Sequence, residues 1–273
     1  MFNFLHTFLP SPLIISLGAV NIYWYGLFVV LGTIAGLTIS LKLAKKFGLS
    51  SETAFDVAFW LIIWGLIGAR IYHVFLEWGY YSANPVNIFK IWQGGLAIHG
   101  GIIGALLAIF IYSFRHKINF WVLAGIFAPA LALGQAIGRW GNYFNQELFG
   151  KPTDLPWGIP IDLMNRPHLY ISADYFHPTF LYEFLGNLIV FAILIFLIKK
   201  FVTAREEKVT GAKIVLLAYL IMYSILRFTL EFLRTDTTAY FFGWRWPQVI
   251  SIIIFITAII LLFWPKRKKR EIS

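Results

Sequence analysis

The amino-acid sequence predicts an all-α polytopic membrane protein that crosses the bilayer about seven times. Of its 273 residues, 59% are hydrophobic and only 13% are charged, which is too apolar a mixture for a water-exposed surface. The mean hydropathy of +0.72 reflects apolar runs of about 20 residues that recur along the whole chain. This pattern excludes both a disordered chain and a soluble enzyme held by a single anchor.

Seven apolar runs, bounded by charges or by proline and glycine, are expected to form the spans. They cover approximately residues 21–41, 54–76, 96–114, 120–139, 178–198, 211–233 and 246–264. Residues 1–20 lack a basic segment and a clear small-residue cleavage site, so we expect an interfacial segment on the outer face rather than a removed signal peptide. We predict a single integral-membrane domain over 1–273, with an outer-face cap at about 140–177.

Glycines that recur four residues apart are expected to let neighbouring helices approach closely, because each pair lies on one helix face. The pairs are Gly32/Gly36, Gly100/Gly104 and Gly134/Gly138.

The distribution of basic residues predicts the orientation in the membrane. Alternate loops, starting after the first span, and the tail carry fifteen lysines and arginines, including the run Lys266–Arg270. The opposite loops hold only five, which are Lys90, Lys151, Arg166, Arg234 and Arg245. By the positive-inside rule the N-terminus lies outside and the C-terminus in the cytoplasm. The net charge of +10 is therefore read as a topology signal, and no nucleic-acid partner is expected.

Polar side chains within the predicted spans gather at the outer level of the membrane, where ionisable groups are costly and usually face a cavity or a partner. The sixth span carries four polar residues at spacings of 4, 4 and 3, which places them on one narrow stripe of the helix. They are Tyr223, Arg227, Glu231 and Arg234. Only Asp56 falls clearly at an inner end. The outer residues are Tyr25, Arg70, His99, Arg139, His177, Tyr182, Glu183, Tyr223, Arg227, Glu231 and Arg234.

Three of these residues, Arg70, Arg139 and Arg227, suit a phosphate group, because the guanidinium fork binds phosphate oxygens bidentately. A phospholipid headgroup fits that chemistry. The alternatives are that Arg227 and Glu231 pair only with each other, and that His99, between glycines, is a hydrogen-bonded interfacial histidine.

The sequence contains no cysteine, which excludes a thiolate nucleophile, a disulfide framework and an iron–sulfur cluster. There is also no P-loop, no G-x-S-x-G elbow and no histidine pair at metal-ligand spacing. Any thiol chemistry must use a thiol from outside, and no metal or organic cofactor is expected.

One polar segment beside the fourth span has a distinctive pattern. Residues 138–150 read GRWGNYFNQELFG, and they resemble the signature of the prolipoprotein diacylglyceryl transferase family. Further motifs support the resemblance over nearly the whole chain, although Tyr143 stands where the family more often has Phe and the loop after Gly150 matches poorly. These motifs are NIYWYGL, GARIY, WQGGLAIHGG, HPTFLYE and YSILRFTLEFLR.

The resemblance implies a bacterial plasma-membrane (inner-membrane) enzyme of lipoprotein maturation. Its two substrates would be phosphatidylglycerol, a membrane lipid, and prolipoprotein signal peptides with a lipobox cysteine. The sn-1,2-diacylglyceryl group would pass to the cysteine thiol as a thioether, with release of glycerol 1-phosphate. Both substrates would meet at the outer leaflet.

The resemblance also implies roles for the matching residues. Arg139 and Arg227 would bind the phosphate and the leaving group, with Glu231 orienting Arg227. His99 would be the general base or a headgroup ligand, since an unperturbed histidine has a pKa of about 6.5, and Tyr223 competes for the base role. The substrate-binding residues would be Tyr25, Arg70, Arg139, Asn142, Glu147 and Gly150.

Other classes remain as alternatives. A transporter or flippase for an anionic lipid would also use intramembrane arginines, but its site usually lies near the midplane, often between inverted repeats, and we find no internal repeat. A structural membrane subunit gives no reason for three arginines at this depth. An intramembrane protease would need a Ser–His or paired-Asp arrangement, and neither is evident.

Overall fold

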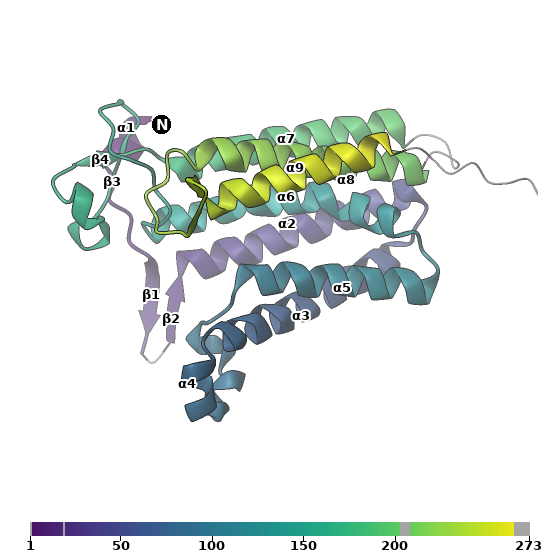
Figure 1. The fold of residues 1–273 in the computed structure, drawn as a ribbon, viewed down its shortest axis with the longest axis horizontal. Helices are drawn as coiled ribbons and strands as arrows, with labels where there is room; N and C mark the ends of the chain where they lie inside the picture. Colours follow the sequence, from purple (N-terminus) through teal and green to yellow (C-terminus); the bar gives the residue numbers. More distant parts are fainter. Residues whose placement is uncertain (1, 19, 203–207, 265–273) are drawn as a thin grey trace, which may run out of the picture.

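Seven long helices form the protein in the computed structural model, which describes residues 2–18, 20–202 and 208–264 (Figure 1). All seven are long and apolar enough to cross a membrane, which confirms the predicted fold class. The fourth continues to Phe144, so residues 138–144 of the polar segment are helical. Arg205 and Lys266–Arg270 of the predicted orientation signal lie outside the described residues. The helices are α2 (Trp24–Phe47), α3 (Ser51–Leu76), α5 (Ile98–His116), α6 (Phe120–Phe144), α7 (Thr179–Phe201), α8 (Lys208–Leu230) and α9 (Trp246–Phe263).

Helix α6 lies at the centre of the bundle and packs against α2, α7 and α8. Helix α3 pairs with α5, and α9 packs on α8. Large apolar side chains on the outer helix surfaces, such as Ile34, Phe59 and Phe196, are exposed, as expected for groups that face lipid.

Glycines produce the close helix contacts, as predicted for five of the six positions. A Cβ at Gly32 would lie 3.1 Å from the Gly134 carbonyl oxygen on α6. A Cβ at Gly100 or Gly104 would collide with the backbone of α3. Gly138 differs, because a Cβ there would meet nothing within 4 Å among the described residues.

The short connections at one end of the bundle follow from local capping. Gly48 ends α2 in the left-handed region at φ 81°. The Ser50 hydroxyl then caps α3 by accepting from the backbone N–H of Thr53 at 3.0 Å. Asn119 caps α6 in the same way, accepting from the N–H of Trp121 at 2.9 Å.

The short elements gather at the other end, which we call the loop end (Figure 1). The hairpin formed by the first two strands has every described side chain exposed. The cap shares an apolar core with the N-terminal segment and the following helix, and this core includes Leu5, Phe149, Phe176 and Phe180. The loop-end elements are α1 (Phe2–Thr7), β1 (Leu13–Leu17), β2 (Val20–Tyr23), α4 (Trp78–Ala83), η1 (Pro85–Phe89), η2 (Ile91–Gln93), β3 (Ile159–Pro160), η3 (Leu163–Asn165), η4 (His168–Tyr170), β4 (Tyr175–Phe176), β5 (Tyr240–Phe241) and β6 (Trp244–Arg245).

Candidate functional site

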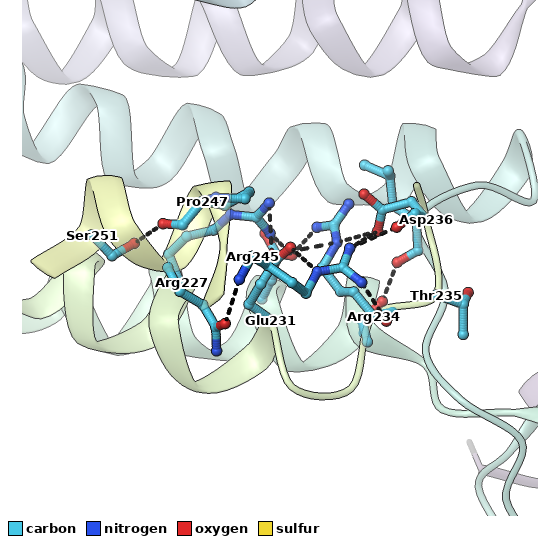
Figure 2. Close-up of polar contacts among 12 residues, drawn as sticks. Arg227, Glu231, Arg234, Thr235, Asp236, Arg245, Pro247 and Ser251 are labelled. Atoms are coloured by element: carbon cyan, nitrogen blue, oxygen red, sulfur yellow. Dashed lines mark hydrogen bonds and ion pairs between the residues drawn. The ribbon is translucent and has the colours of Figure 1, made fainter. Parts of the chain in front are cut away.

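Charged side chains from four parts of the chain meet at the loop end of the bundle. Helix α6 contributes one arginine in its last turns, and α7 contributes a glutamate near its start. The end of α8 with the segment after it, and β6, contribute the others, all of which are labelled in Figure 2. We call this group the arginine–carboxylate cluster, and its members are Arg139, Glu183, Arg227, Glu231, Arg234, Asp236 and Arg245.

Glu183 is buried and joins three arginines from two other helical segments. Its Oε2 lies 2.7 Å from Nε of Arg139. Its Oε1 accepts a hydrogen bond from Nη1 of Arg234 at 3.0 Å and lies 3.8 Å from Nη1 of Arg227. A carboxylate removed from water needs such partners, so Glu183 fixes the relative positions of α6, α7 and the end of α8.

Glu231 is the second buried carboxylate, and its side chain has no exposed surface. Its Oε2 lies 2.9 Å from Nη2 of Arg227, one helical turn earlier. Its Oε1 accepts a hydrogen bond from Nε of Arg245 at 2.7 Å. The expected orientation of Arg227 by Glu231 is therefore present in the geometry, but Arg227 and Glu231 do not pair only with each other.

Arg234 lies behind these contacts, outside the α8 helix. Its Nε donates to Asp236 at 2.8 Å, and its side chain is only 3% exposed. Burial alone would lower the pKa of Arg234, but the carboxylates of Glu183 and Asp236 outweigh it and raise the pKa above its usual value. Arg234 is therefore a charged support of the cluster.

The cluster keeps unused positive charge on one side. It combines four arginines with three carboxylates, which leaves one excess positive charge. The side chains of Arg139 and Arg227 are 19% and 18% exposed, which makes them the most exposed of the four arginines. Nε of Arg139 and Nη1 of Arg227 are buried and face Glu183, at 2.7 and 3.8 Å, so the exposed surface of these two side chains lies at their other atoms. The arrangement can bind an anion.

The predicted residues of the polar segment extend this side. Nη1 of Arg139 donates to the Asn142 side-chain oxygen at 3.0 Å, and the Asn142 amide donates to Glu147 at 2.7 Å. Gly150 lies further along the chain, where its N–H bonds to the His177 carbonyl oxygen and a Cβ would lie 2.7 Å from the His177 Cβ. It allows the cap to pass close to the segment before α7.

Arg70 is the predicted phosphate ligand whose surroundings fit that role least. It is buried in α3, and its guanidinium donates to the carbonyl oxygens of residues 87, 88, 94 and 95. The Tyr81 ring lies 5.1 Å from its Cζ. These bonds use four of its five N–H groups, so Arg70 fastens the segment between α4 and α5.

The remaining predicted residues differ in how closely they are connected to the cluster. The Tyr25 ring packs against Gly141 of α6, beside Asn142. Tyr223 lies one turn before Arg227 on α8 and stacks on Tyr219 at 5.8 Å between ring centroids. His99 is exposed in the first turn of α5, with its ring 6.1 Å from that of Tyr72, and no contact in the described residues joins it to the cluster.

Four cluster members were absent from the predicted site, and one of them, Asp236, was not singled out at all. Glu183 and Arg234 were recognised only as polar residues at the outer level, and Arg245 only as one of the few basic residues in the outer loops. The signal for Glu183 was its depth, since a lone carboxylate at the start of a span requires cationic partners.

The family model and the similar proteins all indicate the same enzyme family. Residues 12–264 match the family model described as prolipoprotein diacylglyceryl transferase. The chain is 40% identical to the phosphatidylglycerol–prolipoprotein diacylglyceryl transferase of Synechococcus elongatus over 263 residues, which cover 96% of this chain and 90% of that protein. The proteins of the same name from Acaryochloris marina and Finegoldia magna are each 42% identical, over 96% and 94% of this chain and 93% and 96% of theirs.

Proposed function

Because the chain belongs to the prolipoprotein diacylglyceryl transferase family, it is an enzyme that transfers a diacylglyceryl group from phosphatidylglycerol to prolipoproteins, and we propose that the arginine–carboxylate cluster is its active site. The proposed acceptor is the thiol of a lipobox cysteine in the signal peptide. The absence of cysteine from the chain fits a reaction whose thiol comes from the substrate.

The proposed step is a displacement at carbon. The cysteine sulfur forms a bond to the terminal glyceryl carbon of the diacylglyceryl group, while the bond from that carbon to the phosphate oxygen breaks. The thiol proton leaves to a base, and glycerol 1-phosphate departs with one more negative charge than the phosphodiester carried. Catalysis therefore requires stabilisation of charge that develops on the phosphate.

The observation that carries the proposal is the pair Arg139 and Arg227. Both side chains are partly exposed, at 19% and 18%, in a cluster with one excess positive charge, and both are held by the buried carboxylates Glu183 and Glu231. Arginine forks fixed in advance need no reorganisation when the negative charge develops.

The other predicted residues have proposed roles around this pair. His99 is the proposed general base or headgroup ligand, and Tyr223, one turn from Arg227, is its competitor. Tyr25, Asn142 and Glu147 would shape the headgroup site, which the contacts of Tyr25 with Gly141 and of Asn142 with Arg139 support.

The proposed location is the bacterial inner membrane, with the loop end toward the outer leaflet. There the cluster would meet both the lipid headgroup and a signal peptide that has crossed the membrane. We propose that the whole chain forms one integral-membrane domain, with the cap beside this site.

The first test supplies purified protein in detergent with phosphatidylglycerol and a lipobox peptide. We expect glycerol phosphate release and a diacylglyceryl mass increase on the cysteine, and neither with a Cys→Ser peptide. Arg139→Ala should reduce turnover by at least about a hundredfold while the protein still folds, because one preorganised donor of this kind contributes roughly that factor. Full activity of Arg139→Ala would refute the proposed site, and lipid movement across a bilayer without either product would favour transport.

A further inference from the structure

The hairpin β5–β6 reaches back to the cluster through one side chain, Arg245. This residue ends β6 and precedes the first residue of α9. Its Nη1 donates to the Arg234 carbonyl oxygen at 3.1 Å and its Nη2 to that of Asp236 at 2.7 Å. These two bonds hold the guanidinium in place, and its Nε then meets Glu231 at 2.7 Å (Figure 2).

A cavity of about 560 Å³ lies beside the contact between Arg245 and Glu231. The cavity lies between the hairpin, the end of α8 and the cap segment near Tyr170. Glu231 and Arg245 both line it, yet the Glu231 side chain has no exposed surface. Removal of the Arg245 side chain would therefore enlarge the cavity next to a buried carboxylate that has lost one of its partners.

The two oxygens of the Glu231 carboxylate contact different arginines, and this arrangement determines which N–H groups of Arg227 are paired with Glu231. Arg245 occupies Oε1, so Arg227 approaches Glu231 only at Oε2, and Nη1 of Arg227, 3.8 Å from Glu183, makes no hydrogen bond to either carboxylate. Without Arg245, both oxygens of Glu231 would attract Arg227, and the cluster would contain three arginines and three carboxylates. The excess positive charge that suits an anion would then be lost.

We propose that Arg245 is a positioning residue for the transfer reaction, which acts through Glu231 to keep Arg227 available for the phosphate of phosphatidylglycerol. This inference rests on the proposed function of the cluster. Arg245 itself would not touch the lipid or the reacting atoms.

The test compares Arg245→Gln, Arg245→Lys and the wild type, with KM measured separately for phosphatidylglycerol and for the lipobox peptide. We expect Arg245→Gln to raise KM for the lipid roughly tenfold and to lower kcat, because a hydrogen bond to a buried charge has about that effect. KM for the peptide should not change. Arg245→Lys restores the charge and should recover part of the lipid KM.

Arg166→Gln is the matched control, because Arg166 also bonds to backbone carbonyls, of Ile161 and Ile171, but lies outside the cluster. Its KM for the lipid should equal that of the wild type. If Arg245→Gln lowered only kcat, or raised both KM values equally, Arg245 would be a general support of the fold and the proposal would be wrong. No recovery with Arg245→Lys would also overturn it.

A second readout separates this proposal from the proposed function. The rise in Tm caused by phosphatidylglycerol reports lipid binding without turnover. We expect that rise to be smaller in Arg245→Gln than in the wild type and in Arg166→Gln. Absence of transfer by the wild type would refute the proposed function, whereas an equal lipid-induced rise in Arg245→Gln would refute the role of Arg245.

Discussion

At the scale of single residues, Glu183 shows how a buried carboxylate organises the site. Replacement by Gln would leave Arg139 and Arg234 without the charge that offsets their removal from water. We expect Glu183→Gln to lower the free energy of unfolding by about 3–5 kcal/mol, the range for breaking one partner of a buried ion pair. Unfolding in detergent measures this loss.

Asp236→Asn is the control for that experiment. It removes the same charge from the same cluster, but the Asp236 side chain is 30% exposed, so its loss should cost about 1 kcal/mol or less. Equal losses in the two variants would show that burial does not set the strength of these pairs.

His177 gives a prediction for pH. Burial lowers the pKa of this histidine below its usual value of 6.5, and its Nδ1 lies 3.2 Å from the Tyr182 hydroxyl. As the pH falls below 6.5, the unfolded chain takes up a proton that the folded chain binds less readily, so the folded state loses stability. The Tm of the wild type should therefore fall more steeply from pH 7.5 to 5 than that of His177→Gln, and parallel curves would contradict this.

Residue type and depth predicted Arg139, Arg227 and Glu231 but could not separate them from Arg70. The sequence places all three arginines at the same depth in the membrane. In the structure, however, the N–H groups of Arg70 already donate to backbone carbonyl oxygens. Which donors remain open depends on how a loop folds over the side chain. The role of Arg245 was hidden for the same reason, since its partner Glu231 is brought close only when β5 and β6 form a hairpin.

At the scale of elements, hydropathy predicted every span, with ends within six residues of those observed, because each helix must cover the membrane thickness. The strands were not predicted, since most contain only two residues and show no alternating pattern. The glycine spacing, in contrast, correctly indicated where two helices touch. Helices α3 and α5 meet where Gly104 faces the backbone of Trp64 and Gly68.

The contact between α3 and α5 can be tested by replacing a glycine with alanine, which adds a single methyl group. Gly104→Ala would place a methyl group against backbone atoms that cannot move aside, and we expect a loss of about 1–3 kcal/mol of stability. Gly138→Ala is the matched control, since a Cβ there meets nothing described within 4 Å and alanine favours the helix. Thermal unfolding compares the two, and a loss in Gly138→Ala as large as that in Gly104→Ala would show that helix contact is not the cause.

At the scale of the whole molecule, the chemistry is confined to one end of the bundle. The arginine–carboxylate cluster, the cap and the hairpins all lie at the loop end, whereas the opposite end carries short turns beside basic residues such as Lys45 and Lys46. An odd number of spans places the start of α2 and the end of α9 at opposite ends (Figure 1). The positive-inside rule then predicts that the loop end faces outward.

The cysteine-free sequence makes this orientation directly measurable, because one introduced cysteine reports one position. Thr237 is exposed at the loop end, and Lys46 is exposed in the last turn of α2 at the other end. A membrane-impermeant maleimide should label Thr237→Cys in intact spheroplasts and Lys46→Cys only after permeabilisation. The opposite pattern would place the cluster at the cytoplasmic leaflet, away from a signal peptide that has crossed the membrane, and would separate the proposed site from its protein substrate.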